Sequence, residues 1–300
     1  MVNVWQKIRT SGLWLSILAV VLSCILITQR GVLLGQDFTG GYVTEFQIVK
    51  DLTASELEHE LNVVVPGNFR LSSNGVLQWQ LFQPPQNEVE EPLSWQTKLP
   101  DSMGIKILDS RFVGSQVGSE LVEQGGLALL VSLLAVGLYL IVRFEWRLAV
   151  SASLALLHDI VITVACFSLT GMEFDLTVLA ALLAIVGYSL NDSIIIGDKV
   201  RELVRVRPDA LVSDTINEAL GTTLGRTTIT SSTTLTTVAA IWWLGGASLQ
   251  GFACALFVGI AVGTWSSIFV SATLPQWLGL SFANYQRVYT DQEQRQLAEP

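Results

Sequence analysis

The sequence predicts a mainly α-helical membrane protein with six transmembrane helices and a small α+β extracytoplasmic domain between the first and second helices. Half of the 300 residues are hydrophobic and only 14% are charged, well below the roughly 25% charge of a typical soluble domain. The apolar residues gather in runs long enough to cross a bilayer, and a polar stretch of about eighty residues follows the first run.

The net charge of −9 is unevenly distributed along the chain. Between Arg30 and Glu123 there are 13 acidic and 6 basic residues, against 13 and 11 in the remainder. The excess of acid therefore belongs largely to the polar stretch, and nothing in it suggests nucleic-acid binding.

The cysteines give no sign of a metal site or a disulfide framework. Cys24, Cys166 and Cys254 all lie in apolar runs and lack metal-ligand spacing. We interpret them as small apolar side chains that fill space between helices. We expect neither a metal, a cofactor nor an enzymatic activity.

The apolar runs divide the chain into domains. Residues 1–30 are predicted to form a cytoplasmic N-terminus and the first transmembrane helix. A cleaved signal peptide is the alternative, but the run is long and no A-x-A-like site follows it. Residues 31–120 are predicted to form the extracytoplasmic domain, 121–280 a five-helix transmembrane region, and 281–300 a cytoplasmic tail. The five runs of that region are 125–142, 148–169, 176–196, 227–244 and 251–274.

The polar stretch is typical of a small α+β domain with a limited core. A helix over 55–62 follows Thr53, which starts the Thr-x-x-Glu pattern of a capping box. Ser-Asn-Gly at 73–75 is a hairpin signal, and the acidic, proline-rich stretch 84–92 is expected to be a loop. The expected strands are 42–50, 69–72, 76–82 and 105–113.

Basic residues predict the orientation, because cytoplasmic loops carry an excess of Lys and Arg. With six spans, every basic cluster outside the polar domain falls on one side of the membrane, and that domain falls on the other. Both termini are then cytoplasmic. A cytoplasmic connector at 198–225 is predicted to contain an amphipathic helix over 210–220. The basic residues concerned are Lys7, Arg9, Arg143, Arg147, Lys199, Arg201, Arg205, Arg207, Arg287 and Arg295.

Asp192 is the most informative residue because it lies inside an otherwise apolar run. A charged residue at such a position costs roughly 2.5–3.5 kcal/mol on insertion scales, and it needs a partner. Asp192 lies roughly 9 Å along its helix from Asp198, toward the middle of the membrane. Arg226 immediately precedes the run 227–244 and lies at a similar depth if that helix begins near Gly221. Changes in their separation would alter proton affinity, so the pair is a candidate proton relay. The alternative is that Arg226 is a flanking charge that snorkels to the interface.

Further polar residues are candidates for an accessory relay or a structural role. The hydroxyl-rich run 227–234 either joins helices by hydrogen bonds or lines a hydrated path, and both interpretations stay open. His158 and Asp159 lie near the middle of the third run, where inter-helix bonding and proton transfer are both reasonable. Gly259 and Gly263 have the G-x-x-x-G spacing of close helix contact. The accessory candidates are His158, Asp159, Ser189, Asn191, Thr227 and Thr230.

Five short motifs, in order along the chain, resemble those of the SecF family. Segments 37–41, 143–147, 155–159, 187–193 and 226–231 are similar to D-x-x-G-G, R-F-E-W-R, A-L-x-H-D, G-Y-S-x-N-D-[ST] and R-T-x-x-T-S, respectively.

The chain departs from the family pattern in two places. Ser115 stands where the family usually has Pro, and Gly197-Asp198-Lys199 replaces the more usual Phe-Asp-Arg. Both departures put local loop geometry in doubt rather than the relay.

The resemblance implies a subunit of the SecDF accessory complex of the bacterial Sec translocase, within the resistance-nodulation-division superfamily. It implies a pseudosymmetric partner, SecD, contact with the Sec translocon channel and a membrane insertase, and preprotein clients. It also implies that Asp192 and Arg226 take part in proton-driven motion of the extracytoplasmic domain. Asp37, Gly40 and Gly41 form the extracytoplasmic motif. The implied location is the bacterial inner (plasma) membrane, with an internal membrane such as a thylakoid as the alternative.

Two other functions stay open at this point. One is half of a proton-coupled small-molecule exporter, although superfamily exporters carry two large extracytoplasmic domains and about twice the spans. The other is a non-conducting structural scaffold of the translocon. A coupling cation other than the proton also remains an alternative.

Overall fold

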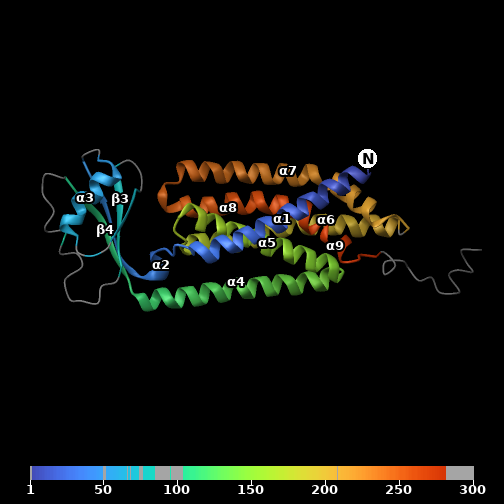
Figure 1. Ribbon diagram of the computed structural model, residues 1–300, viewed down its shortest axis with the longest axis horizontal. Coiled ribbons are helices and arrows are strands. Elements are labelled where there is room, and N and C mark those ends of the chain that lie inside the picture. Colours follow the sequence, from blue (N-terminus) through green and yellow to red (C-terminus); the bar gives the residue numbers. More distant parts are fainter. Residues whose placement is uncertain are drawn as a thin grey trace, which may run out of the picture.

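The computed structural model describes residues 2–49, 52–65, 67, 69–73, 77–84, 95, 104–207 and 209–281. These residues form a long helical bundle with a sheet domain at one end (Figure 1). The start of the first helix lies at the opposite end of the bundle. The bundle helices are α1 (Val2–Arg30), α4 (Ser115–Arg143), α5 (Trp146–Thr170), α6 (Leu176–Val206), α7 (Val212–Leu244) and α8 (Ala247–Ser266).

Within the described residues, five helices are long and apolar enough to cross a membrane, as five of the predicted runs require. The run predicted at 227–244 lies in α7, which has 33 residues. This helix is rich in Ser and Thr and is not among the five apolar helices. The chain is therefore a multi-pass membrane protein. The five helices span Val4–Arg30, Gln116–Arg143, Trp146–Thr170, Leu176–Val206 and Ser248–Trp277.

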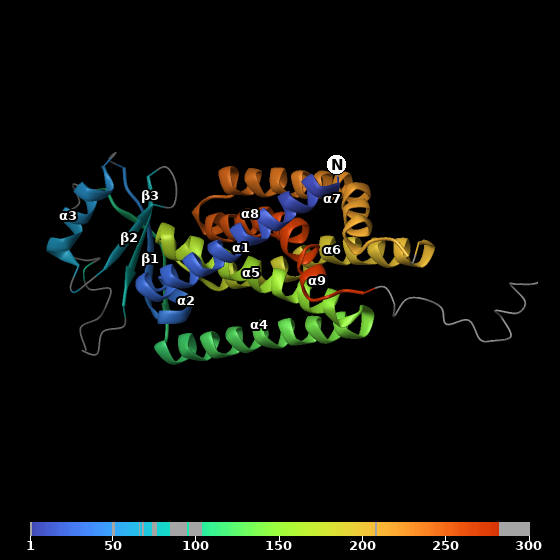
Figure 2. The same ribbon diagram turned by 45° about the vertical axis from the view of Figure 1, so that its right-hand side comes forward.

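The residues of the predicted connector at 198–225 are mostly helical and extend the helices on either side of it. Helix α6 continues to Val206, and the separate helix expected at 210–220 joins the span expected at 227–244 in the continuous helix α7. The hydroxyls of Thr222 and Thr223 donate to carbonyls one turn earlier, and no proline interrupts the segment. The first part of α7 crosses the end of the bundle, and the rest runs along α8 (Figure 2).

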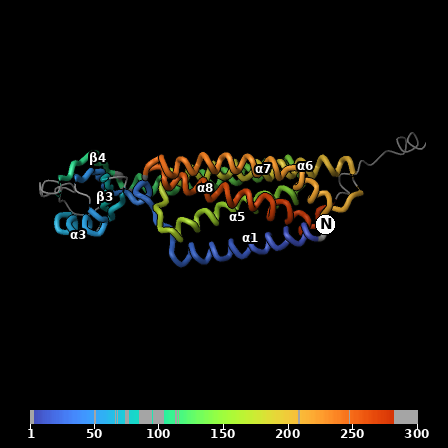
Figure 3. The backbone as a smooth tube through the Cα atoms, turned by 90° about the horizontal axis from the view of Figure 1, so that it is seen from above, coloured from blue at the N-terminus to red at the C-terminus, as the bar shows by residue number. Residues whose placement is uncertain are grey.

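The arrangement of helices places α5, α6 and α8 at the centre of the bundle. Helix α1 packs against α5 on one edge, and α6 and α7 lie toward the other edge in the view from above (Figure 3). Helix α8 continues into a π-helical segment, η3 (Ser267–Ser271), and then into the short helix α9 (Leu274–Trp277).

The described residues of the polar domain form an antiparallel sheet on which helix α3 (Ala54–Val64) packs, in agreement with the predicted α+β domain. The hairpin of β2 and β3 is present, and β1 pairs with both β3 and β4 to give the order β2-β3-β1-β4. Helix α3 begins with the predicted capping box, in which the Thr53 backbone N donates to Glu56 Oε2 at 2.9 Å. The expected loop at 84–92 lies almost wholly outside the described residues. The strands are β1 (Gly41–Gln47), β2 (Arg70–Ser73), β3 (Gln78–Gln83) and β4 (Lys106–Val113).

The domain has a larger core than its length suggested. Leu57 and Leu61 from α3 pack on Phe46 and Leu81 of the sheet, and all four side chains are fully buried. Alternate strand residues point to one face, and helix α3 and the fully buried Trp95 pack in the core on that face.

Gly41 starts β1 in a conformation that favours glycine, with φ of 132°. A Cβ at this position would lie 2.4 Å from the Gln83 carbonyl oxygen of the paired strand. No side chain fits there without moving the backbone of β3.

We therefore expect Gly41→Ala to destabilise the sheet domain by about 1–3 kcal/mol, the usual cost of a strained backbone position. Thermal unfolding of the full chain in detergent, combined with limited proteolysis of the domain, measures this. Gly126→Ala is the matched control, because a Cβ at Gly126 meets nothing within 4 Å. Equal unfolding temperatures for the two variants would contradict the assignment.

Candidate functional site

Asp159 on α5 is fully buried and is bound by side chains from two other helices. Its Oδ2 accepts hydrogen bonds from Ser189 Oγ on α6 at 2.5 Å and from Ser266 Oγ at the end of α8 at 2.9 Å. Its Oδ1 lies 2.9 Å from His158 Nδ1. Burying a carboxylate without partners is very costly, so these groups fix the relative positions of α5, α6 and α8.

Two glycines of α8 allow this close approach, as their spacing predicted. A Cβ on Gly263 would lie 3.3 Å from Ser189 Cβ and 3.4 Å from Asp159 Oδ2. A Cβ on Gly259 would lie only 2.3 Å from Ile185 Cδ1. Larger residues at these positions would push α8 away from α6.

Asp192 lies one turn beyond Ser189 on α6 and is only 3% exposed. It faces α7, where Thr227 and Arg226 are the side chains that favour the charged form of its carboxylate. Arg226 is itself exposed, and no ion pair within the described part of the chain joins it to Asp192. Thr227 Oγ1 is buried and has no hydrogen-bond partner within the described residues. The structure thus brings the predicted pair to neighbouring helices without a direct ion pair.

The hydroxyl-rich part of α7 bonds mainly to its own backbone. Thr230 Oγ1, for example, donates to the carbonyl one turn earlier at 3.0 Å. Two contacts cross to other helices: Tyr188 Oη donates to Thr234 Oγ1 at 3.3 Å, and Thr264 Oγ1 donates to Ser231 Oγ at 2.7 Å. Hydrogen bonding between helices is therefore present at two points, and the hydrated path stays a prediction.

Two accessory candidates differ from the rest of the set. Asn191 is exposed, so the structure does not bring it into the Asp159 cluster. His158 belongs to the cluster through Nδ1, while its buried Nε2 has no hydrogen-bond partner within the described residues.

The Asp37 motif connects the sheet domain to the start of α6. It lies in α2 (Gln36–Thr39), and Asp37 Oδ2 accepts a hydrogen bond from the Leu176 backbone N, the first residue of α6, at 3.2 Å. Beside it, the Gly35 backbone N donates to Phe174 O at 2.8 Å. A carboxylate near a helix N-terminus is favoured by the unsatisfied N–H groups there. Gly40, with φ of 68°, ends α2 and turns the chain into β1.

A second link joins the sheet domain to the same turn. Arg70 Nη1 of β2 lies 3.4 Å from Glu173 Oε1 in the turn between α5 and α6. Burial raises the pKa of Glu173, and Asp175 and Asp37 also raise it, against the opposing effect of Arg70.

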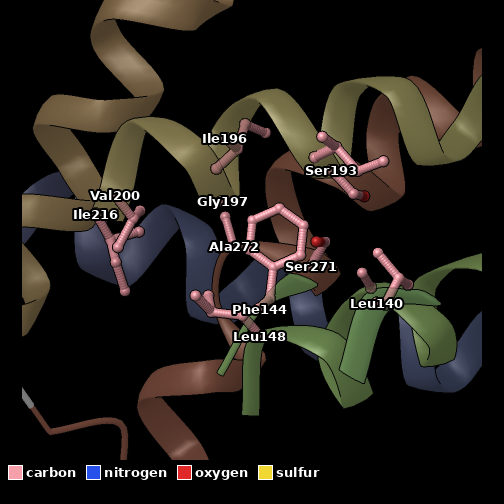
Figure 4. Close-up of a pocket in the computed structure, with 12 residues that line it drawn as sticks. Leu140, Phe144, Leu148, Ser193, Ile196, Gly197, Val200, Ile216, Ser271 and Ala272 are labelled. Carbon is pink, nitrogen blue, oxygen red and sulfur yellow. The ribbon is translucent and has the colours of Figure 1, made fainter. Parts of the chain in front are cut away.

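At the opposite end of the bundle, Arg143 and Asp198 form an ion pair of 2.9 Å between α4 and α6. Arg201 Nη1 donates to the Arg143 carbonyl at 3.0 Å. The adjoining residues Phe144 and Gly197 line a largely apolar pocket, in which the Phe144 ring faces Gly197 (Figure 4). A Cβ on Gly197 would lie 3.1 Å from Phe144 Cε1, so this departure from the family motif leaves space for the ring.

Sequence reasoning missed two residues of this region. Ser266, a partner of Asp159, lies almost one turn after Gly263, and only the glycine spacing marked that face of α8. Arg9 was expected to be a flanking charge, but it is fully buried and its Nη1 donates to the Ala272 carbonyl at 3.3 Å. The sequence shows that Arg9 precedes the first apolar run, but it does not show which other helix end the side chain binds.

Known proteins share this architecture. A family model described as protein export membrane protein SecD/SecF, C-terminal, matches residues 96–281. The protein translocase subunit SecF of Vibrio alginolyticus is 39% identical over 282 residues, which cover 92% of this chain and 89% of that protein. The chain belongs to the SecF family. SecF of Escherichia coli O157:H7 is 34% identical, over 88% of this chain and 84% of its own.

The crystal structure of SecDF from Thermus thermophilus has the same fold, with a TM-score of 0.83 and 32% identity. It matches 92% of this chain but only 38% of the SecDF chain. The SecF resemblance drawn from the five motifs is thus confirmed. In this SecF-family chain, four of the motifs supply the Asp37 link, the Arg143 ion pair, the Asp159 cluster and Asp192, and the fifth contains Arg226.

We predict that Asp159→Ala lowers stability more than Ser266→Ala does. Removing the carboxylate leaves the Ser189 hydroxyl and the His158 imidazole without their acceptor, at about 1–3 kcal/mol for each unsatisfied group, whereas the Ser266 hydroxyl keeps the Gly263 carbonyl as an acceptor. Removing one hydroxyl leaves Oδ2 with a second donor. Thermal unfolding of the full chain in detergent compares them, and a smaller loss for Asp159→Ala would contradict the clustered geometry.

Stability is also expected to depend on pH through Glu173. Because the raised pKa means that the folded state binds the proton more tightly, the contribution of this group is present at low pH. It is lost as the pH rises from the usual value of 4.5 through the raised one. Unfolding temperatures measured from mildly acid to neutral pH should show that Glu173→Gln flattens this dependence. Glu60→Gln, at an exposed position on α3, serves as control and should leave the slope unchanged.

Proposed function

We propose that this chain is a SecF-type subunit that works with SecD and uses the proton motive force to assist preprotein translocation. The observation that carries the proposal is the position of α6. One end of this helix binds the base of the sheet domain through Asp37, and its later part holds the buried Asp192 beside Arg226 on α7.

A proton that reaches Asp192 removes its negative charge and so weakens its attraction to Arg226. Since the two groups form no ion pair, a small change in their separation or hydration changes the energy of the charged state. Helices α6 and α7 then shift relative to each other. The Leu176–Asp37 and Gly35–Phe174 contacts transmit the movement of α6 to the sheet domain. Motion of that domain would pull on or release an emerging preprotein.

This function requires a particular arrangement in the membrane. We count α7 as a span in addition to the five apolar helices, which gives six spans, with the sheet domain extracytoplasmic and both termini cytoplasmic in the bacterial inner membrane. The position of the start of α1 at the end opposite the sheet supports this topology. Because the chain covers 38% of the SecDF chain, we infer that SecD supplies the remaining membrane half. The Sec channel and a membrane insertase are further partners.

A structural scaffold is the second candidate function. It is supported by the Asp159 cluster, whose Oδ2 is bound by two hydroxyls and which holds three helices together. A scaffold needs the packing of α5, α6 and α8 but does not need a charge at position 192.

We therefore predict that Asp192→Asn abolishes proton-driven stimulation of preprotein translocation while the complex with SecD still assembles. Arg226→Met should reduce stimulation in the same way. The assay is translocation into inverted membrane vesicles with and without an imposed proton gradient, alongside co-purification of SecD.

Asp209→Asn, an identical change at an exposed residue between α6 and α7, is the control and should retain full stimulation. Normal stimulation in Asp192→Asn would reject the proton-relay function and favour the scaffold. Loss of SecD binding in the same variant would show that the residue acts through assembly instead.

A further inference from the structure

Two of the three cysteines are neighbours across a helix interface. Cys166 lies one turn before the end of α5, and Cys254 lies about two turns after the start of α8. The two helices pack side by side along the bundle (Figure 1). Both cysteines are free.

The packing around Cys254 independently places it at this level of α5. Cys254 is 3% exposed and belongs to a buried cluster with Phe167, the residue that follows Cys166, and with Val178 and Ala181 of α6. Cys166 is only partly buried. One thiol of the pair is therefore reachable from outside the bundle and the other is held behind it. Cys24 is exposed on α1, a helix that also packs against α5, so it must be removed before the Cys166–Cys254 pair is tested.

We propose that Cys166 and Cys254 are a redox-sensitive pair that forms a reversible disulfide and staples α5 to α8. The sulfur atoms of such a bond lie about 2.05 Å apart and the Cα atoms roughly 4.4–6.8 Å apart, a range that directly packed helices reach. Each thiol loses one hydrogen, the S–S bond forms, and two electrons and two protons pass to the oxidant. A membrane-soluble quinone is a suitable oxidant class, because it takes up both and becomes the quinol.

The staple has a mechanical consequence. Farther along the same interface, Ser266 of α8 donates to Asp159 of α5. A covalent bond at 166–254 and this hydrogen bond together fix α8 against α5 at two levels. Helix α8 packs against both α6 and α7. Fixing it to α5 therefore restricts the shift between α6 and α7 in the proposed cycle, which would stop in the oxidised state and resume on reduction. This regulatory effect rests on the proposed export function, while disulfide formation does not.

The test uses the full chain in its complex with SecD, in membrane vesicles and in a Cys24→Ser background that prevents links between chains. Vesicles are treated with a quinone or with copper phenanthroline and air, and peptide mass spectrometry then maps the bond. We expect a peptide pair joined through 166 and 254 with the loss of two hydrogens. Dithiothreitol should reverse it, and Cys166→Ser and Cys254→Ser should each abolish it. Dibromobimane, which becomes fluorescent on bridging two close thiols, reports adjacency without oxidation.

Each result has a defined meaning. Two free thiols after oxidation overturn the proposal, whether or not dibromobimane bridges them. A disulfide that leaves proton-driven translocation unchanged overturns its regulatory part. Translocation that is lost on oxidation, recovers on reduction and is insensitive to oxidant in Cys166→Ser supports it. If reduced vesicles show no proton-driven stimulation at all, the proposed export function is contradicted. The mass-spectrometric mapping then still tests whether the disulfide between 166 and 254 forms.

Discussion

The burial of the Asp159 carboxylate is the constraint on which the centre of the bundle depends. An unpaired carboxylate in a low-dielectric interior would be strongly destabilising, so the fold must bring hydrogen-bond donors to it. Ser189 and Ser266 come from two different helices, and Gly263 gives them room. The serines, the glycine spacing and the His-Asp pair therefore all serve to bury the Asp159 carboxylate with hydrogen-bond partners.

Helix α6 connects this packing to the rest of the molecule. Its first backbone N–H is bound by Asp37 at the base of the sheet domain. Ser189 attaches its middle to Asp159, and Asp192, one turn later, faces α7. A helix is stiff along its axis because each residue is hydrogen-bonded within it. In the proposed cycle, a change of charge at Asp192 therefore acts on an element that already touches the domain to be moved.

The sequence was most informative where local chemistry determines structure. Apolar length predicted six membrane helices, and five helices of the described residues are long and apolar enough to span. The Thr53 capping box and the hairpin signal predicted elements of the sheet domain. It failed where the outcome depends on partners distant in the chain. Nothing local showed that α7 is continuous, that Arg9 is buried at the end of η3, or that Ser266 binds Asp159. Periodicity indicates which face of a helix is apolar, but not which residue of another helix meets it.

The central claim is that the charge of Asp192 sets the separation of α6 and α7. Pulsed electron paramagnetic resonance tests this most directly, with nitroxide labels at the exposed positions Glu202 and Thr222. The labels are placed in a cysteine-free variant within the SecD complex, in liposomes at acid and alkaline pH. The account predicts a distance distribution that shifts with pH in the otherwise native chain and stays fixed in Asp192→Asn. The same distribution at both pH values in the chain that retains Asp192 would contradict it.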